Sequence, residues 1–152
     1  MLTSLSDRNW VIGQSVLMLA VVILGVTQRG TWHSDAGFGF GAVCFVLGAA
    51  TGIWGVRSLG RSRTPNPTPK ADAELVQHGI YRRLRHPLYS SVMLASLGWA
   101  LLWASTAAIV MTVVLCVFFD AKARLEEQLM QARFPEYAAY RQRTWRFLPG
   151  LY

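Results

Sequence analysis

The chain has 152 residues, of which 53% are hydrophobic and only 15% are charged, and its formal net charge is +7 at pH 7. This length has room for one domain. The apolar residues come in long runs, which are typical of an integral membrane protein and distinguish the chain from a soluble basic domain. The basic residues lie between those runs, where the positive-inside rule accounts for them, so we expect no nucleic-acid partner.

The two cysteines and the N-terminal region bear on whether the chain has a disulfide, a metal site or a signal peptide. Cys44 and Cys116 lie inside apolar runs, without CxxC spacing or a neighbouring histidine cluster. We therefore expect small core side chains rather than a disulfide or a metal site. The N-terminal region has a single basic residue, Arg8, and no small-x-small cleavage site follows the first apolar run. A retained membrane helix is therefore expected rather than a signal peptide.

Two uncharged runs, residues 10–26 and 38–56, are predicted to be the first two membrane helices. At 1.5 Å per residue, a run of 17 residues just spans a hydrocarbon core roughly 30 Å thick. Gly48 and Gly52 in the second run are spaced i,i+4, which lets a neighbouring helix approach closely. We expect them to pack within the monomer, with dimerisation as the alternative. His33, in the loop between the runs, is expected to be solvated rather than a ligand.

A connector over residues 57–74 follows, and it contains the segment Thr-Pro-Asn-Pro-Thr-Pro at 64–69. Such a segment cannot form a helix, and it predicts an extended, partly mobile spacer between two functional halves.

Residues 75–89 are predicted to form a basic turn that leads into a helix. Pro87 favours the first helical position and pushes His86 out of the helical region. The backbone N–H groups of Leu88, Tyr89 and Ser90 would then be free donors at the positive end of a helix dipole, which suits a small anionic group. A basic membrane-edge turn without a ligand is the alternative.

The apolar block at 88–119 is too long for one ordinary span, because 32 residues make a helix of roughly 48 Å. Two helices that turn between Trp99 and Thr106 fit better. Such a hairpin places Arg8, the loop and the tail on one side, which then holds 14 of the 15 basic residues. We therefore predict an all-α polytopic protein of the inner or plasma membrane, with four transmembrane helices and both termini cytoplasmic.

The tail at 120–152 is predicted to be cytoplasmic and helical, with a first helix at 121–134 and a second short helix after Pro135. Because the hairpin returns the tail to the face of the 79–89 turn, the two segments can line one pocket. Each element has a simpler interpretation: the glutamates can pair with surface arginines, the aromatic residues can anchor the interface, and Arg143 and Arg146 can bind anionic lipid headgroups.

Several motifs follow one another in a fixed order over residues 75–149. They are Leu-Val-Gln-His-Gly-Ile-Tyr-Arg-Arg-Leu-Arg-His-Pro-Leu-Tyr at 75–89, a helical hairpin, Arg-Leu-Glu-Glu-Gln-Leu at 124–129, Phe-x-x-Tyr-x-x-Tyr at 134–140 and Arg-x-x-Pro at 146–149. This order resembles the isoprenylcysteine carboxyl methyltransferase and phospholipid methyltransferase superfamily. The chain departs from the family at Ser91 and Pro135, where glycine is common. The first departure bears on how closely the backbone approaches a cofactor, and the second on a helix break.

The resemblance implies an S-adenosylmethionine-dependent membrane methyltransferase without the soluble Rossmann fold. The residues that match the cofactor-binding positions of the family are His86, Tyr89, Glu126, Glu127 and the backbone of Gly79, Ile80 and Tyr81. The resemblance also implies that Arg146, with Arg143 as a second candidate, steers an anionic acceptor such as a carboxylate. An amine or thiol acceptor would need a base, for which Glu127 or Tyr140 is the candidate.

Two other functions remain open from the sequence. The His-Pro turn and the Arg-x-x-Pro ending also resemble the C-terminal half of membrane sterol reductases, which use NADPH, but the Glu-Glu pair matches the methyltransferases better. The other alternative is a non-catalytic membrane protein whose basic surface binds anionic lipid or a partner. If the chain is a methyltransferase, its short length suggests a small lipophilic or lipid-like acceptor; a monomer and a homodimer are both compatible with the sequence.

Overall fold

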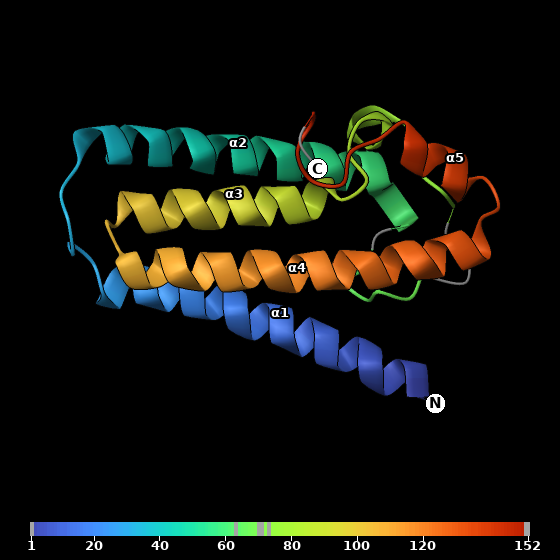
Figure 1. Ribbon diagram of the computed structural model, residues 1–152, viewed down its shortest axis with the longest axis horizontal. Coiled ribbons are helices and arrows are strands. Elements are labelled where there is room, and N and C mark those ends of the chain that lie inside the picture. Colours follow the sequence, from blue (N-terminus) through green and yellow to red (C-terminus); the bar gives the residue numbers. More distant parts are fainter. Residues whose placement is uncertain (1, 63, 70–71, 73, 151–152) are drawn as a thin grey trace.

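The computed structural model describes residues 2–62, 64–69, 72 and 74–150. The described residues form helices only, apart from an isolated parallel bridge between Leu84 and Trp145, so the predicted all-α class is confirmed. The helices are α1 (Leu2–Thr27), α2 (Asp35–Leu59), η1 (Gly60–Ser62), η2 (Gly79–Arg82), α3 (Pro87–Leu102), α4 (Thr106–Arg133) and α5 (Tyr137–Gln142). The four long helices lie side by side, with α3 between α2 and the pair formed by α1 and α4 (Figure 1).

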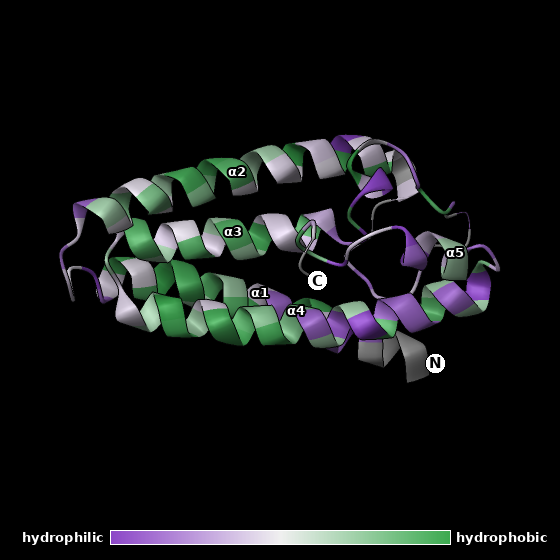
Figure 2. Cartoon of the chain, turned by 45° about the horizontal axis from the view of Figure 1, so that its top comes forward, coloured by the Kyte–Doolittle hydropathy of each residue, from purple (hydrophilic) through white to green (hydrophobic). Residues whose placement is uncertain are grey.

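Three of the described helices are long and apolar enough to cross a membrane, namely Asp7–Thr27, Asp35–Leu59 and Thr106–Arg133. Large hydrophobic side chains such as Leu19, Val46 and Val117 point outward from them, as expected for surfaces that face lipid. In Figure 2, α4 is hydrophobic over its first half and hydrophilic over its second. The fourth predicted span, α3, is apolar but has only 16 residues, so the topology with four spans stays a prediction.

The predicted hairpin is confirmed, because α3 ends at Leu102 and α4 begins at Thr106. Ser105 fixes the turn: its hydroxyl accepts from Ala108 N (3.2 Å) and donates to Leu24 O of α1 (3.0 Å). An N-cap of this kind satisfies one of the free donors at the start of a helix. The hairpin returns the chain, so the start of α3 and the hydrophilic half of α4 lie at the same end of the bundle (Figure 1).

Glycines let α2 and α3 pack backbone against backbone. A Cβ atom on Gly48 would lie 2.7 Å from Ala95 N and 2.8 Å from Ser91 O, and one on Gly98 would lie 2.5 Å from Phe45 N. The Ser91 hydroxyl adds a hydrogen bond to Gly48 O (2.7 Å). Packing within the monomer is therefore confirmed for Gly48, and Ser91 contacts α2.

Adding one methyl group at this contact is expected to destabilise the bundle. Gly48→Ala must push two backbones apart, which costs about 1–3 kcal/mol for overpacking. Gly39→Ala on the same helix is the matched control, because its Cβ meets nothing within 4 Å and alanine favours the helix. Thermal unfolding in detergent should show a lower melting temperature for Gly48→Ala alone. Equal melting temperatures would contradict the close approach.

Candidate functional site

A cavity of about 160 Å³ lies at the hydrophilic end of the bundle. Its lining comes from the end of α2, from the Pro-rich connector and from the turn that leads into α3. The first turn of α3, the second half of α4 and the helix α5 complete it. Of the residues predicted from the sequence to form the site, five line this cavity: Tyr81, His86, Tyr89, Glu126 and Tyr140. The lining thus comes from both halves of the chain, as the hairpin prediction requires.

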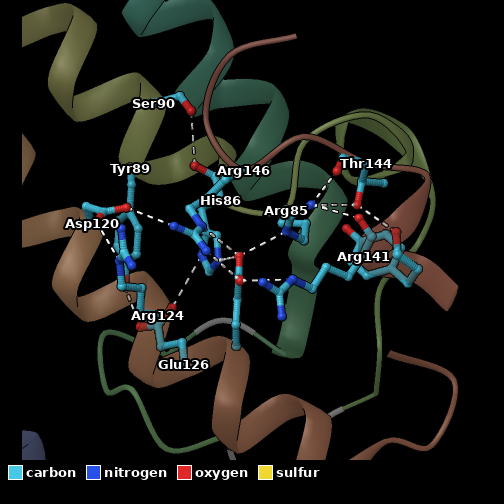
Figure 3. A network of polar contacts seen from close by, with 12 residues as sticks. Arg85, His86, Tyr89, Ser90, Asp120, Arg124, Glu126, Arg141, Thr144 and Arg146 are labelled. Carbon is cyan, nitrogen blue, oxygen red and sulfur yellow. Dashed lines mark hydrogen bonds and ion pairs between the residues drawn. The ribbon is translucent and has the colours of Figure 1, made fainter. Parts of the chain in front are cut away.

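The structure brings His86 and Tyr89 against Glu126 (Figure 3). Tyr89 donates its hydroxyl hydrogen to Glu126 Oε1, and His86 Nδ1 lies 3.5 Å from Glu126 Oε2. The rings of His86 and Tyr89 are nearly parallel, with centroids 5.4 Å apart. Pro87 is the first residue of α3, as predicted, so His86 is the N-cap and Tyr89 lies in the first turn of that helix.

The predicted free donors at the start of α3 are only partly available. The backbone N–H groups of Tyr89 and Ser90 both donate to His86 O (3.1 Å each). The prediction was therefore wrong for these two groups, because the carbonyl of the residue before Pro87 already accepts from them. The cavity consequently offers mainly side-chain groups to a ligand.

Glu127 is the centre of a buried ion cluster rather than a cavity residue. It is 3% exposed. Arg146 binds it in a bidentate manner, with Nε to Oε1 and Nη2 to Oε2 both at 3.0 Å, and Arg85 Nε lies 2.9 Å from Oε1. The other Nη of Arg146 donates to Asp120 Oδ1 (2.9 Å). Bidentate charge-assisted pairs of this kind are strong and geometrically specific. Glu127 and Arg146 therefore hold the C-terminal tail against α4.

Arg85 joins the turn before α3 to α4 and to the tail. Besides Glu127, its side chain donates to Arg141 O (3.0 Å) and to Thr144 O. Its backbone N–H donates to Trp145 O (2.8 Å), so the turn and the tail run in parallel as an extended pair. Arg82 and Arg83, the two other arginines of this segment, are exposed. The local sequence does not distinguish the buried Arg85 from the exposed Arg82 and Arg83.

The tail tyrosines are buried, so the interpretation of Tyr137 and Tyr140 as interfacial anchors is wrong. Both line the cavity, and the Tyr140 hydroxyl donates to Tyr81 O (2.7 Å). Burial raises the pKa of Tyr140, which makes it a poor base near neutral pH. Trp145 is 41% exposed and remains suited to an interfacial position. Pro135 lies between α4 and α5 and ends the first helix, as predicted.

The remaining predicted residues lie beside the cavity rather than in its wall. Arg143 is exposed and donates to Gln77 Oε1. Ile80 is buried with Tyr81 and Leu84 in a small apolar cluster. Gly79 has φ +58° and packs against Ser58, a position that a residue with a side chain would occupy only with strain. Gly79 and Ile80 therefore shape the turn that presents Tyr81 to the cavity.

The two nearby carboxylates favour the protonated form of His86. Among the described residues its Nε2 finds no hydrogen-bond partner of good geometry, although it lies 3.3 Å from Glu127 Oε1. Burial alone would lower the pKa of His86, but its interactions with Glu126 and Glu127 outweigh burial and raise that pKa. A raised folded-state pKa stabilises the fold fully below about pH 6.5, and the contribution is lost as the pH rises through the folded-state value.

The effect of His86→Asn on stability should therefore depend on pH. We expect the melting temperature of the variant to lie furthest below that of the wild type near about pH 6 and to approach it as the pH rises. His78→Asn, at an exposed position, is the control for general pH effects. Thermal unfolding over a pH series measures both differences, and a pH-independent effect of His86→Asn would contradict a protonated imidazole.

A sequence model described as phospholipid methyltransferase matches residues 37–137 of the chain. The nickel-cobalt-cadmium resistance protein NccN of Alcaligenes xylosoxydans xylosoxydans is 28% identical over 144 residues, which are 93% of this chain and 63% of that protein. The cobalt-zinc-cadmium resistance protein CzcN of Cupriavidus metallidurans is 33% identical over 139 residues, 88% of this chain and 59% of that protein.

A probable protein-S-isoprenylcysteine O-methyltransferase of Oryza sativa is 32% identical over 78 residues, which are 50% of this chain and 41% of that protein. The chain spans less than two thirds of the length of each of these three curated relatives.

Proposed function

Since the chain belongs to the phospholipid methyltransferase family, we propose that it is a membrane methyltransferase that uses S-adenosylmethionine and acts on a small lipophilic or lipid-like acceptor. The observation that carries the proposal is a cavity at the hydrophilic end of the bundle that combines the Glu126 carboxylate with a set of tyrosine rings. When bound, the cofactor supplies an electrophilic methyl group on a positively charged sulfonium.

The wall of the cavity suits a cation. Tyr81, Tyr137 and Tyr140 line it, and aromatic faces attract cationic groups such as quaternary ammonium ions. Tyr89 also lines it, but its ring is stacked on His86 and Phe119. Glu126 adds a carboxylate whose side chain is 17% exposed, and it would pair with the ammonium group or the ribose hydroxyls of the cofactor. The residues present therefore fit a ligand with a sulfonium and an ammonium group.

The cavity also has apolar side chains that suit an apolar acceptor. Leu59, Val76, Leu88 and Met130 line it, and Leu59 and Leu88 belong to helices whose other parts are strongly apolar. Methyl transfer from a sulfonium depends on in-line positioning and on a water-poor site. These side chains would exclude water and hold a lipophilic acceptor, so a prenylated or lipid-like molecule is the class that we propose.

The structure changes the roles that we propose for Arg146 and Glu127, which the sequence suggested as residues that act on the acceptor. Arg146 is paired with Glu127 and Asp120 and does not line the cavity, so it supports the site rather than steering an anionic acceptor. Glu127 is paired with Arg85 as well as with Arg146. Glu126 is the carboxylate of the pair that lines the cavity, and we propose that it pairs with the cofactor rather than acting as a base.

We also propose that the hydrophilic end faces the cytoplasm, because the positive-inside rule places the loop and tail arginines there. The printed names of two relatives concern resistance to nickel, cobalt, cadmium and zinc. Within the described ranges, no group of three or more potential metal ligands occurs.

Calorimetry on protein purified in detergent tests the proposal. We expect saturable binding of S-adenosylmethionine and of its demethylated product, S-adenosylhomocysteine, and no competition by NADPH. Binding of NADPH alone would favour the reductase alternative. Binding of none of the three by protein with a cooperative melting transition would overturn the proposal and leave a lipid-binding or partner-binding role.

A further inference from the structure

Lys122 is a fully buried lysine on α4, one helical turn before Glu126. Its Nζ donates to Gln14 Oε1 of α1 (2.5 Å) and to the backbone oxygen of Pro65 in the connector (2.7 Å). An ammonium group is expensive to bury unless oxygen atoms replace its hydration shell. These two oxygen atoms do so, and they come from two other parts of the chain.

The connector segment that Lys122 contacts forms one wall of the cavity. We call residues 64–69 the strap. Its residues Thr64, Asn66, Pro67 and Pro69 line the cavity, whereas Pro65 and Thr68 contact the helices. Proline has no backbone N–H, so a segment with three prolines has few backbone donors to hold it in place. Side chains of the helices must therefore fix its position.

Two such contacts hold the strap. One is the hydrogen bond from Lys122 to Pro65 O. The other runs from the Thr68 hydroxyl to Asp7 Oδ1 of α1 (3.0 Å). The strap follows the end of α2, and α2 packs mainly on α3. From there the strap reaches α1 through Thr68 and α4 through Pro65. The strap consequently crosses from one side of the bundle to the other at the hydrophilic end.

Lys122 also contacts a second wall of the cavity without lining it. Its Nζ lies 5.5 Å from the centroid of the Tyr89 ring, and Tyr89 in turn donates to Glu126. A cation over an aromatic face is attracted to it, more strongly when both are desolvated. One side chain therefore contacts the strap on one side and the Tyr89–Glu126 pair on the other.

We propose that Lys122 is a positioning residue, which keeps the strap closed over the cavity and thereby sets how long the cofactor stays bound. The part of this inference that concerns the cofactor rests on the proposed function, whereas the attachment of the strap does not. Removing the ammonium group frees Pro65 O, so the strap opens more often and the bound cofactor leaves faster.

Thiol labelling of the strap tests the attachment without any ligand. Pro67 is buried. In a background with Cys44 and Cys116 replaced by alanine, the thiol introduced by Pro67→Cys should therefore react with a maleimide too large for the cavity only when the strap opens. We expect Lys122→Met to speed this reaction about tenfold and Thr68→Val, which leaves the helices unchanged, to speed it several-fold, as for the loss of a single hydrogen bond. Gln131→Met, at an exposed position of α4, is the matched control and should have no effect.

The dissociation rate of S-adenosylhomocysteine tests the second part. It should rise about tenfold in Lys122→Met and several-fold in Thr68→Val, with the number of binding sites unchanged. A purely structural role would instead lower the melting temperature and the number of sites without changing the rate. Unchanged labelling in both variants overturns the inference, whether or not the cofactor binds. If the two variants are labelled faster and the wild-type protein binds no cofactor, the attachment of the strap is supported and the proposed function is overturned.

Discussion

Replacing Glu127 with glutamine is expected to destabilise the protein by about 3–5 kcal/mol, the cost of removing one partner from a buried ion pair. Arg146, Arg85 and His86 all lie within 3.3 Å of its carboxylate oxygens. An amide cannot balance these positive charges, so they would remain buried without compensation. Because Arg146 attaches the tail to α4, the tail should detach as part of the same transition.

Thermal unfolding in detergent, combined with limited proteolysis of the tail, measures this effect. Glu136→Gln is the matched control, because Glu136 is exposed and lies just before α5. The control should keep the wild-type melting temperature and the same proteolysis pattern. A Glu127→Gln variant that is as stable as the wild type would show that the cluster does not hold the tail.

The sequence predicted the arrangement of the helices because the hydropathy and the charge of each segment can be summed from its residues without knowing its tertiary contacts. The length of the 88–119 block and the sidedness of the basic residues required a hairpin, and α3 and α4 form it. The start of α1 was predicted at residue 10, whereas the helix begins at Leu2. Hydropathy cannot locate this start, because polar residues continue a helix beyond its apolar part at little cost.

The sequence also predicted that the two glutamates lie near His86, but not that their surroundings differ. Neighbouring residues on a helix point about 100° apart, so only the rotation of α4 decides which of them faces the cavity. That rotation depends on packing against α1 and α3. It directs Glu126 to the cavity and Glu127 to Arg85 and Arg146.

The same limit explains why Lys122 was not predicted. In the sequence it is one of six basic residues of the tail, all of which fit a solvated cytoplasmic surface. Its burial depends on Gln14 and Pro65, which lie 108 and 57 residues away along the chain. No local pattern links three such positions, so the connector was predicted as a partly mobile spacer and not as a cavity wall.

Glu126→Gln is expected to weaken cofactor binding about 10-fold to 100-fold, the value of one hydrogen bond to a charged group. Glutamine keeps the shape of the side chain and still accepts the hydrogen bond from Tyr89, but it carries no charge for the ammonium group that S-adenosylmethionine and S-adenosylhomocysteine share. Because Glu126 is not the centre of the buried arginine cluster, the melting temperature should change much less than in Glu127→Gln. Calorimetry with S-adenosylhomocysteine and thermal unfolding measure the two effects separately.

Glu74→Gln is the matched control for this prediction. Glu74 also lines the cavity, but it lies on the exposed connector and its backbone N–H contacts Ser62. If any carboxylate near the cavity attracted the cofactor through its charge alone, the two substitutions would weaken binding equally, and added salt would reduce both effects. A pocket built around Glu126, Tyr89 and His86 instead predicts a large loss for Glu126→Gln and a small, salt-sensitive one for Glu74→Gln. Equal losses of affinity in the two variants would contradict a specific contact between the cofactor and Glu126.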